Sequence, residues 1–164
     1  MKGRLVARYG LLTALAMVLS YIETLIPLSF AVPGVKLGLA NLTVIFALYR
    51  LGPKPAAALS LLRVVLVSFT FGNAYSFWYS LAGAALSFLI MALLRRQDWF
   101  GELGVSVAGG VCHNIGQIAV AAIVLRSTAA AYYLPVLLFS GVLTGMAVGA
   151  AAAVLIRRVP PFER

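Results

Sequence analysis

The sequence predicts an all-α integral membrane protein, in which residues 1–164 form a single transmembrane helical domain with six spanning helices. Three observations predict this fold: the composition, the spacing of the apolar runs and the distribution of the basic residues. Hydrophobic residues make up 63% of the chain and charged residues 10%. Soluble domains carry about 25% charged residues and fewer than half apolar ones, so the composition excludes an ordinary soluble protein.

Six apolar runs are candidates for the spanning helices, because a helix that crosses the bilayer needs ~20 mainly apolar residues. They cover residues 5–26, 35–51, 55–71, 75–94, 103–125 and 133–156. The second and third runs are short, so we expect them to cross with little tilt or to be extended by interfacial turns. Residues 27–34, between the first two runs, are too apolar for a solvated loop, and we expect them to fold back against the bundle.

The basic residues supply an independent test of the six spans. Ten of the 13 lysines and arginines lie at the chain ends or in alternate loops, namely Lys2, Arg4, Arg8, Arg50, Lys54, Arg95, Arg96, Arg157, Arg158 and Arg164. The opposite loops hold only Lys36 and Arg126. The positive-inside rule therefore predicts that both termini are cytoplasmic, in a cytoplasmic membrane of the bacterial type. The same bias explains the net charge of +9, so we expect no nucleic-acid partner.

The scarcity of acidic residues excludes most enzyme chemistry. The chain has four acids, Asp98 is its one aspartate, and His113 and Cys112 are its one histidine and one cysteine. These residues cannot build a zinc site or a Ser-His-Asp triad. Residues 34–38, Gly-Val-Lys-Leu-Gly, lack the P-loop pattern that holds nucleotide phosphates. We therefore expect no catalytic residue, no metal and no cofactor, and an ATPase that energised transport would be another polypeptide.

Polar residues within the apolar runs mark the candidate site, since a charge at a helix centre costs ~2.5–3.5 kcal/mol. At ~1.5 Å per residue from the basic side, Arg63 lies about 12 Å deep and His113 about 15 Å deep. Five further polar residues fall in the outer half, namely Glu23, Lys36, Asn41, Asn73 and Gln117. We expect these seven residues to bind a small-molecule substrate in a cavity that opens to the outside, with Arg63 and His113 near its floor.

Structural roles stay open for several of these residues. Glu23 is as well explained by an ion pair with Lys36, which lies at a similar depth. His113 and Gln117 share one helix face at i, i+4, and hydrogen bonding between helices explains that pair equally well. Asn114 points about 100° away from this face, so we expect it to hold neighbouring helices together.

Small residues at a spacing of four indicate where helices pack closely. The last apolar run carries Gly141, Gly145, Gly149 and Ala153, for which we favour packing within the chain. The first run has a weaker version, Gly10 with Ala14 and Ala16 with Ser20, for which docking to another membrane protein is nearly as well supported. Aromatic residues gather at predicted outer-interface positions and indicate an interfacial belt, namely Tyr75, Phe77, Trp78, Tyr79, Tyr132 and Tyr133.

Several runs of the sequence resemble the Gx transporter family, which is also labelled heptaprenyl diphosphate synthase component I. They are residues 22–27 (Ile-Glu-Thr-Leu-Ile-Pro), 33–41 (Pro-Gly-Val-Lys-Leu-Gly-Leu-Ala-Asn), 61–63 with 71–73, and 110–117. The resemblance implies a fold similar to the substrate-binding S components of energy-coupling factor transporters. Such a fold has six helices, an outward-open site in the outer half and a capping first loop.

The two family labels imply different functions. A prenyl diphosphate synthase holds magnesium diphosphate with paired aspartate-rich motifs, which a chain with one aspartate cannot supply. We therefore expect a membrane-embedded subunit that captures a small organic solute from outside. The alternative is a non-catalytic partner of a heptaprenyl diphosphate synthase or of quinone-linked electron transfer.

The resemblance and the residues also suggest what this subunit binds. S components usually dock a transmembrane coupling subunit, with ATPases in trans, through an Ala-x-x-x-Ala face of the first helix, and the nearest match here is Gly10 with Ala14. Arg63, Lys36 and His113 favour an anionic or hydrogen-bond-accepting solute. Glu23 could instead contact an amine or carry a proton, which would couple transport to an ion gradient.

Overall fold

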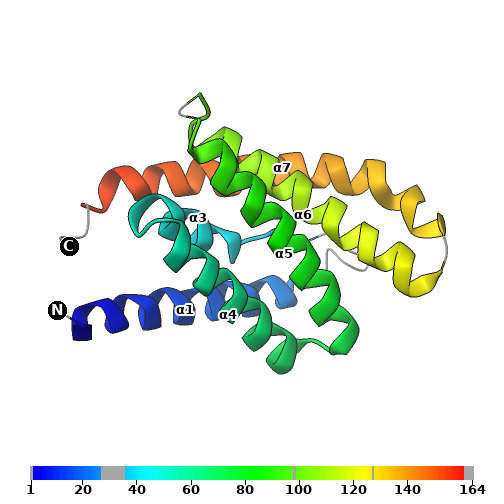
Figure 1. Ribbon diagram of the computed structural model, residues 1–164, viewed down its shortest axis with the longest axis horizontal. Coiled ribbons are helices and arrows are strands. Elements are labelled where there is room, and N and C mark those ends of the chain that lie inside the picture. The colour runs from blue at the N-terminus through cyan, green and yellow to red at the C-terminus, as the bar shows by residue number, and fades with distance from the viewer. Residues whose placement is uncertain (1, 27–35, 98, 127, 161–164) are drawn as a thin grey trace.

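The computed structural model describes residues 2–26, 36–97, 99–126 and 128–160, which form an all-α bundle (Figure 1). Its elements are α1 (Lys2–Leu25), α3 (Asn41–Arg50), α4 (Pro53–Phe71), α5 (Ala74–Arg95), α6 (Glu102–Leu125), the 3-10 helix η1 (Thr128–Tyr133) and α7 (Leu134–Arg158). The predicted all-α class is confirmed. The predicted folding back of residues 27–34 lies outside the described residues.

Five helices of the described chain, α1, α4, α5, α6 and α7, are long and apolar enough to cross a membrane. Their bounds lie close to the predicted runs, and the largest difference is at α1, which begins at Lys2 rather than at residue 5. This agreement follows from physics, because a helix in lipid must be apolar over its whole length and satisfies its backbone internally. The chain is therefore a membrane protein.

The second predicted span is wrong for the described part of residues 35–51. There the chain runs without helical structure through residues 36–38, turns at residues 39–40, and enters α3 only at Asn41. A helix of ten residues is ~15 Å long, about half of the hydrocarbon thickness. Gly38 has a φ of +68°, a left-handed conformation that cannot continue a helix toward residue 35. The described residues thus form five long helices and one half-length helix, in addition to η1.

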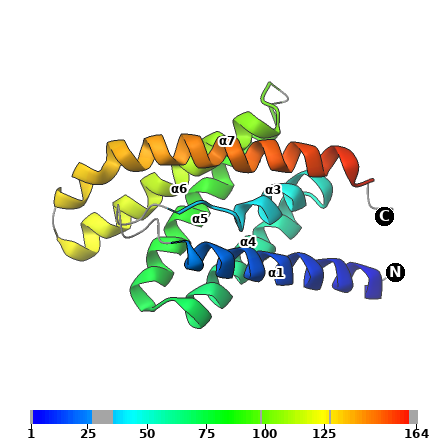
Figure 2. The ribbon, with the colours of Figure 1, turned by 180° about the vertical axis from the view of Figure 1, so that it is seen from behind.

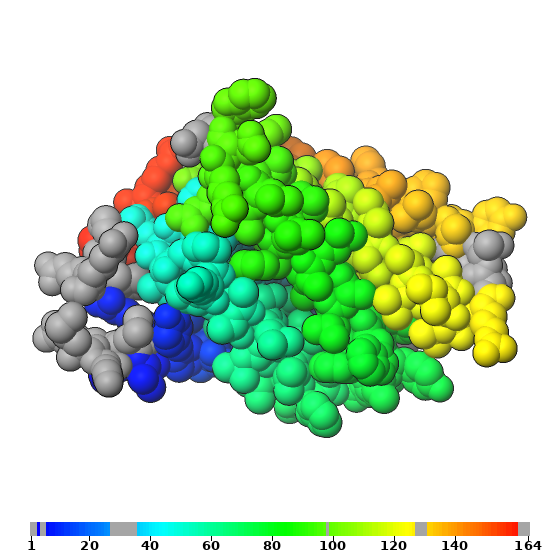
Figure 3. Space-filling view, in the orientation of Figure 1, coloured from blue at the N-terminus to red at the C-terminus, as the bar shows by residue number. Residues whose placement is uncertain are grey.

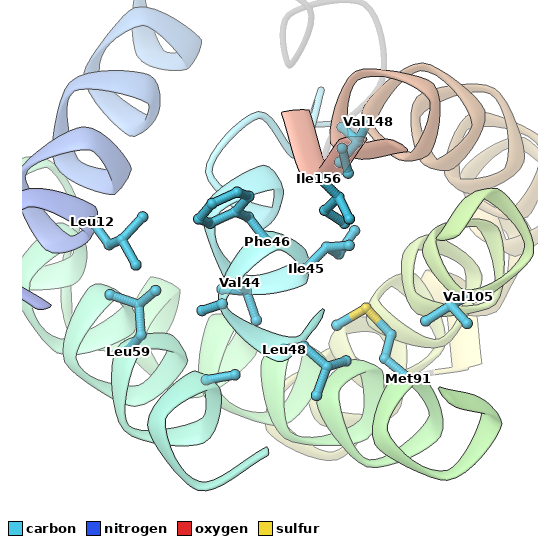
Figure 4. Close-up of a cluster of buried hydrophobic side chains, with 13 residues drawn as sticks. Leu12, Val44, Ile45, Phe46, Leu48, Leu59, Met91, Val105, Val148 and Ile156 are labelled. Atoms are coloured by element: carbon cyan, nitrogen blue, oxygen red, sulfur yellow. The ribbon is translucent and has the colours of Figure 1, made fainter. Parts of the chain in front are cut away.

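The half-length helix α3 lies in the middle of the bundle (Figure 4). Its residues Thr43, Val44, Ile45, Phe46, Ala47 and Leu48 are all buried. Figure 4 shows α3 side chains surrounded by Leu12 of α1, Leu59 of α4, Met91 of α5 and Ile156 of α7, which belong to the same buried cluster. The apolar sequence of α3 therefore reflects burial among other helices instead of contact with lipid.

Helices α6 and α7 pack backbone against backbone because glycines line their contact. A Cβ added at Gly110 would lie 2.5 Å from the carbonyl oxygen of Gly141, and one added at Gly145 would lie 2.7 Å from the Cα of Val107. A Cβ at Gly149 would lie 2.9 Å from the Cα of Leu103. The preferred interpretation of the Gly141, Gly145 and Gly149 spacing as packing within the chain is confirmed.

Basic residues collect at one end of the bundle, which we call the basic end. There α1 begins, α3 leads into α4, α5 leads into α6, and α7 ends, whereas the α4–α5 and α6–α7 connections lie at the other end (Figures 1 and 2). A guanidinium nitrogen of Arg50 donates to the carbonyl of Val159, and one of Arg95 donates to the carbonyl of Tyr49 at 3.3 Å. These bonds connect the ends of α3, α5 and α7.

The outer surface of the bundle is apolar, as a surface in contact with lipid must be. In Figure 3 helices α4 and α5 cover much of the visible face. Phe69 of α4 and Leu89 of α5 are among the large hydrophobic residues left exposed. Tyr75, Trp78, Tyr132 and Tyr133 are exposed toward the end opposite the basic end, where α5 and α7 begin. Their position agrees with an interfacial belt.

Candidate functional site

A cavity of about 300 Å³ lies among α1, α4, α5, α6, α7 and the segment that leads into α3. It exists because α3 is short: the helix fills the centre of the bundle from its first residue, Asn41, to Arg50 at the basic end, and leaves space beyond Asn41. Asn41 itself lines the cavity. The non-helical residues 36–38 are at the edge of this space, as expected, since irregular backbone within a membrane is tolerated only where it lines a cavity or is buried in protein.

Five of the seven predicted site residues line this cavity: Glu23, Lys36, Asn41, Arg63 and His113. They come from five different parts of the chain, namely α1, the segment before α3, α3, α4 and α6. Residues that are up to 90 positions apart in the sequence therefore meet at one place. Whether they bind a solute stays a prediction.

Glu23 holds the segment before α3 in place. Its Oε1 accepts a hydrogen bond of 2.7 Å from the backbone N–H of Gly38. An unwound backbone within a membrane leaves N–H groups without intrahelical partners, and this carboxylate satisfies one of them. Glu23 also attracts Lys36 electrostatically, without a salt-bridge contact among the described residues. Lys36 is exposed at the edge of the cavity.

Arg63 is the charged residue nearest the middle of a long helix. Its guanidinium is attracted by the carboxylate of Glu23 and repelled by the ammonium group of Lys36. Its Nε is buried and has no hydrogen-bond partner among the described residues. A buried charged donor without an acceptor is costly, so a partner from outside the described residues would be needed to satisfy this Nε.

His113 is fixed against α5. Its side chain is hydrogen-bonded to the backbone of Gly83, and it interacts electrostatically with Arg63 and Lys36. A Cβ added at Gly83 would lie 2.8 Å from the carbonyl oxygen and 3.0 Å from the Cε1 of His113. The missing side chain of Gly83 therefore makes room for the imidazole between the helices.

Two predicted site residues, Asn73 and Gln117, do not line the cavity. Asn73 caps α5: its Oδ1 accepts a bond of 2.9 Å from the backbone N–H of Ser76, and the Ser76 hydroxyl oxygen accepts one from the N–H of Asn73. Gln117 is buried against Gly83 of α5, with its Oε1 unpartnered among the described residues. Depth predicted Asn73, and depth together with the helix face shared with His113 predicted Gln117, but neither signal shows whether a side chain reaches the cavity.

The sequence reasoning missed several polar residues of the cavity. Asn114 donates to the carbonyl of Leu137 on α7, which confirms its predicted packing role, and it also lines the cavity. Hydroxyl-bearing residues complete the lining, namely Ser20, Thr24, Ser68, Ser80, Ser106 and Thr144. The helical spacing of Ser106, Gly110 and His113 on one face of α6 is a signal that could have found part of this set.

The proposed docking face of α1 divides into two parts. Gly10 and Ala14 are exposed, and nothing lies within 4 Å of a Cβ added at Gly10. Ala16 is 0% exposed and Ser20 6% exposed, and Ser20 lines the cavity. Ala16 and Ser20 are therefore occupied inside the bundle, and Gly10 with Ala14 is the part of the predicted set that another protein can reach.

The arrangement is suited to binding. Charged groups of both signs, hydroxyls and amides surround a small space inside an apolar bundle, which is the general character of a ligand pocket. Within the described residues no three His, Cys, Asp or Glu side chains come together to hold a metal ion.

The comparisons with known proteins assign the chain to one family. A family model described as heptaprenyl diphosphate synthase component I matches residues 12–155, from the middle of α1 to the last turn of α7. The resemblance seen in the sequence is thereby confirmed for that label. No curated protein and no solved structure matches the chain.

Proposed function

This chain belongs to the heptaprenyl diphosphate synthase component I family, and from its cavity we propose that it is a membrane-embedded solute-binding subunit of a transporter, similar to an S component. The observation that carries the proposal is the cavity of about 300 Å³, lined by Glu23, Lys36, Arg63 and His113, inside an apolar bundle. Ionisable residues within a membrane are costly, and those that persist usually bind a partner or a substrate.

The broken second run supports the same proposal. Transporters commonly bind their substrates near the middle of the membrane, beside helices that are interrupted there. Here α3 is half-length, its first residue lines the cavity, and non-helical residues 36–38 precede it. A bundle that served only as a structural anchor would have no reason to interrupt a helix or to place Arg63 beside the interruption.

The orientation is part of the proposal. The basic end faces the cytoplasm by the positive-inside rule, so the cavity, which lies beyond α3 from that end, is in the outer half. The solute enters from outside and passes inward with partner proteins. A coupling subunit with its ATPases in trans is one such partner, and the exposed Gly10 and Ala14 on α1 are the surface that it can reach.

The family description favours a second candidate, a non-catalytic membrane partner of a heptaprenyl diphosphate synthase. The cavity argues against a direct role in prenyl chemistry, because a chain of seven isoprene units is far too large for about 300 Å³. As a partner, this subunit would contact the synthase through its surface and would not need the cavity at all. The two candidates therefore differ in whether the cavity is occupied.

Native mass spectrometry tests the proposal directly. The full-length protein is purified in detergent after exposure to a small-molecule extract of its host cells, and the complex is examined for a retained solute. We expect a retained mass in the wild type that Thr144→Leu abolishes, because the larger side chain fills part of the cavity. Thr70→Leu is a matched control, because both threonines donate to the carbonyl four residues earlier, yet Thr70 is exposed on α4.

Two results would count against solute binding. One is a wild-type protein that retains nothing from the extract. The other is a retained mass that persists in Thr144→Leu, which would place it outside the cavity. Stable co-purification with a prenyl diphosphate synthase, combined with an empty cavity, would favour the second candidate.

A further inference from the structure

We propose that the solute is a small organic monoanion, bound through its carboxylate between Arg63, Lys36 and the N-terminus of α3. This inference rests on the proposed function and specifies the chemical class that the cavity takes. Three features of the described residues support it: the balance of charge, the uncommitted cationic donors and the direction of α3.

The charges that line the cavity do not balance. Arg63 and Lys36 contribute two positive charges and Glu23 one negative charge, and His113 is counted as neutral at pH 7. The lining therefore carries one excess positive charge, and water screens it least near Arg63, which lies within the bundle. A monoanion brings this balance to zero. A cation would raise the excess to two charges, and a dianion would reverse its sign.

The polar groups of the lining differ in whether they already have a hydrogen-bond partner within the described residues. Glu23 already accepts a hydrogen bond from Gly38, and the Asn114 amide already donates to Leu137. Arg63 and Lys36 are attracted by the charge of Glu23 but form no salt-bridge contact with any described residue, and the Nε of Arg63 has no hydrogen-bond partner there. Neutral groups such as the Ser106 hydroxyl also remain, but the charged groups that are least committed are the cationic donors, and these favour an anionic acceptor.

The dipole of helix α3 also favours an anion. The N-terminus of a helix carries a partial positive charge, and α3 begins at Asn41, which lines the cavity. The backbone N–H groups of Asn41 and Leu42 donate to the carbonyls of Gly38 and Leu39, so α3 contributes the field of its dipole and not these N–H groups. Interrupted helices of transporters direct such N-termini at anionic groups of their substrates. The dipole of α3 thus acts in the same direction as the charges of Arg63 and Lys36.

The size of the cavity limits the rest of the solute. A volume of about 300 Å³ is at the small end of the range of ligand pockets, and its walls include Val64, Val67 and Val148. The carboxylate therefore belongs to a molecule with a short, partly apolar body.

A series of probes that share one body and differ in charge tests this inference. They are 3-methylbutanoate, 3-methylbutanamide, 3-methylbutylamine and free leucine, each at about 10 mM and equal ionic strength, with the Tm of the purified full-length protein as the measurement. We expect 3-methylbutanoate to raise the Tm and the neutral, cationic and zwitterionic probes to raise it much less. A Tm that no probe raises, or one that the amine or the amide raises most, would overturn the inference.

Variants locate the effect in the cavity. Arg63→Gln and Lys36→Gln should each weaken the binding of 3-methylbutanoate about tenfold or more. Arg63→Lys keeps the charge and should retain part of the binding. Lys36 is exposed in the segment before α3, so its variant keeps the test informative if Arg63→Gln does not fold. Arg96→Gln, an exposed arginine beyond the end of α5, is the control that should bind as the wild type does.

The failure of this inference differs from the failure of the proposed function. If native mass spectrometry finds a neutral or cationic solute that Thr144→Leu abolishes, the cavity binds a solute and the inference about its charge is wrong. If the cavity retains nothing and no probe raises the Tm, both proposals fail together.

Discussion

Glu23 shows how one polar residue can serve the architecture and the site together. Its carboxylate accepts the N–H of Gly38 and so stabilises the unwound segment, while its charge interacts with Lys36 and Arg63. The sequence allowed an ion pair, a proton carrier or a ligand contact for this residue. The hydrogen bond to the backbone could not be predicted from the sequence, because it depends on the break before α3. The apolar pattern gave no sign of that break.

Replacing Glu23 separates its hydrogen bond from its charge. Glu23→Ala leaves the N–H of Gly38 without its acceptor, so we expect a loss of about 1–3 kcal/mol in the free energy of unfolding. Glu23→Gln keeps an acceptor oxygen and should lose clearly less. Unfolding by a graded denaturing detergent measures both variants. Equal losses in the two variants would show that the charge, and not the hydrogen bond, stabilises the segment.

Arg63 and His113 were predicted for the site from their depth, and the structure brings both to the cavity. Depth was informative for them because each lies near the middle of a long helix, where polar side chains must turn inward. It failed for Asn73, which lies at a helix end and caps it. It also failed for Gln117, which is close to one helical turn beyond His113 and packs against Gly83 instead.

At the scale of elements, the apolar pattern predicted five helices with nearly correct ends and misjudged the sixth. Hydropathy measures whether a residue avoids water, and both lipid and a protein interior satisfy that preference. Residues 41–50 avoid water inside the bundle, and residues 36–38 do not continue their helix. The φ of +68° at Gly38 is the local cause, and a glycine adopts that conformation or an ordinary one equally well.

Gly38 therefore offers a test of the break before α3. Gly38→Ala places a Cβ on a backbone with positive φ, at a cost of about 1–2 kcal/mol in stability, although nothing lies within 4 Å of that Cβ. Gly38→Asn should cost less, because asparagine tolerates the left-handed conformation. The midpoint of unfolding in detergent measures both. If Gly38→Ala is as stable as the wild type, the left-handed turn is not required.

The contact between α6 and α7 yields a second prediction at this scale. Gly110→Ala places a methyl group 2.5 Å from the carbonyl oxygen of Gly141, so the two helices must separate. We expect a loss of about 1–3 kcal/mol in the free energy of unfolding. Gly10→Ala is the matched control, because nothing lies within 4 Å of the added methyl group on α1. Equal stability of the two variants would contradict the close backbone contact.

At the scale of the whole molecule, the charges separate into two groups with different roles. The basic end carries Arg50 and Arg95, whose guanidinium groups bind backbone carbonyls at the ends of neighbouring helices. The cavity carries Arg63 and Lys36, which interact with the charge of Glu23 but form no salt-bridge contact with the described residues. The first group connects the ends of neighbouring helices, and the second group lines the cavity in which we propose that a solute binds.

The orientation can be tested with single cysteines in a Cys112→Ser background. Arg96→Cys, beyond α5, lies at the basic end, whereas Tyr132→Cys, in η1, lies at the other end, and both side chains are exposed. If the positive-inside rule holds, a membrane-impermeant maleimide labels Tyr132→Cys in intact cells and labels Arg96→Cys only after the membrane is permeabilised. The reverse pattern would place the cavity toward the cytoplasm, and the proposed capture of a solute from outside would then be wrong.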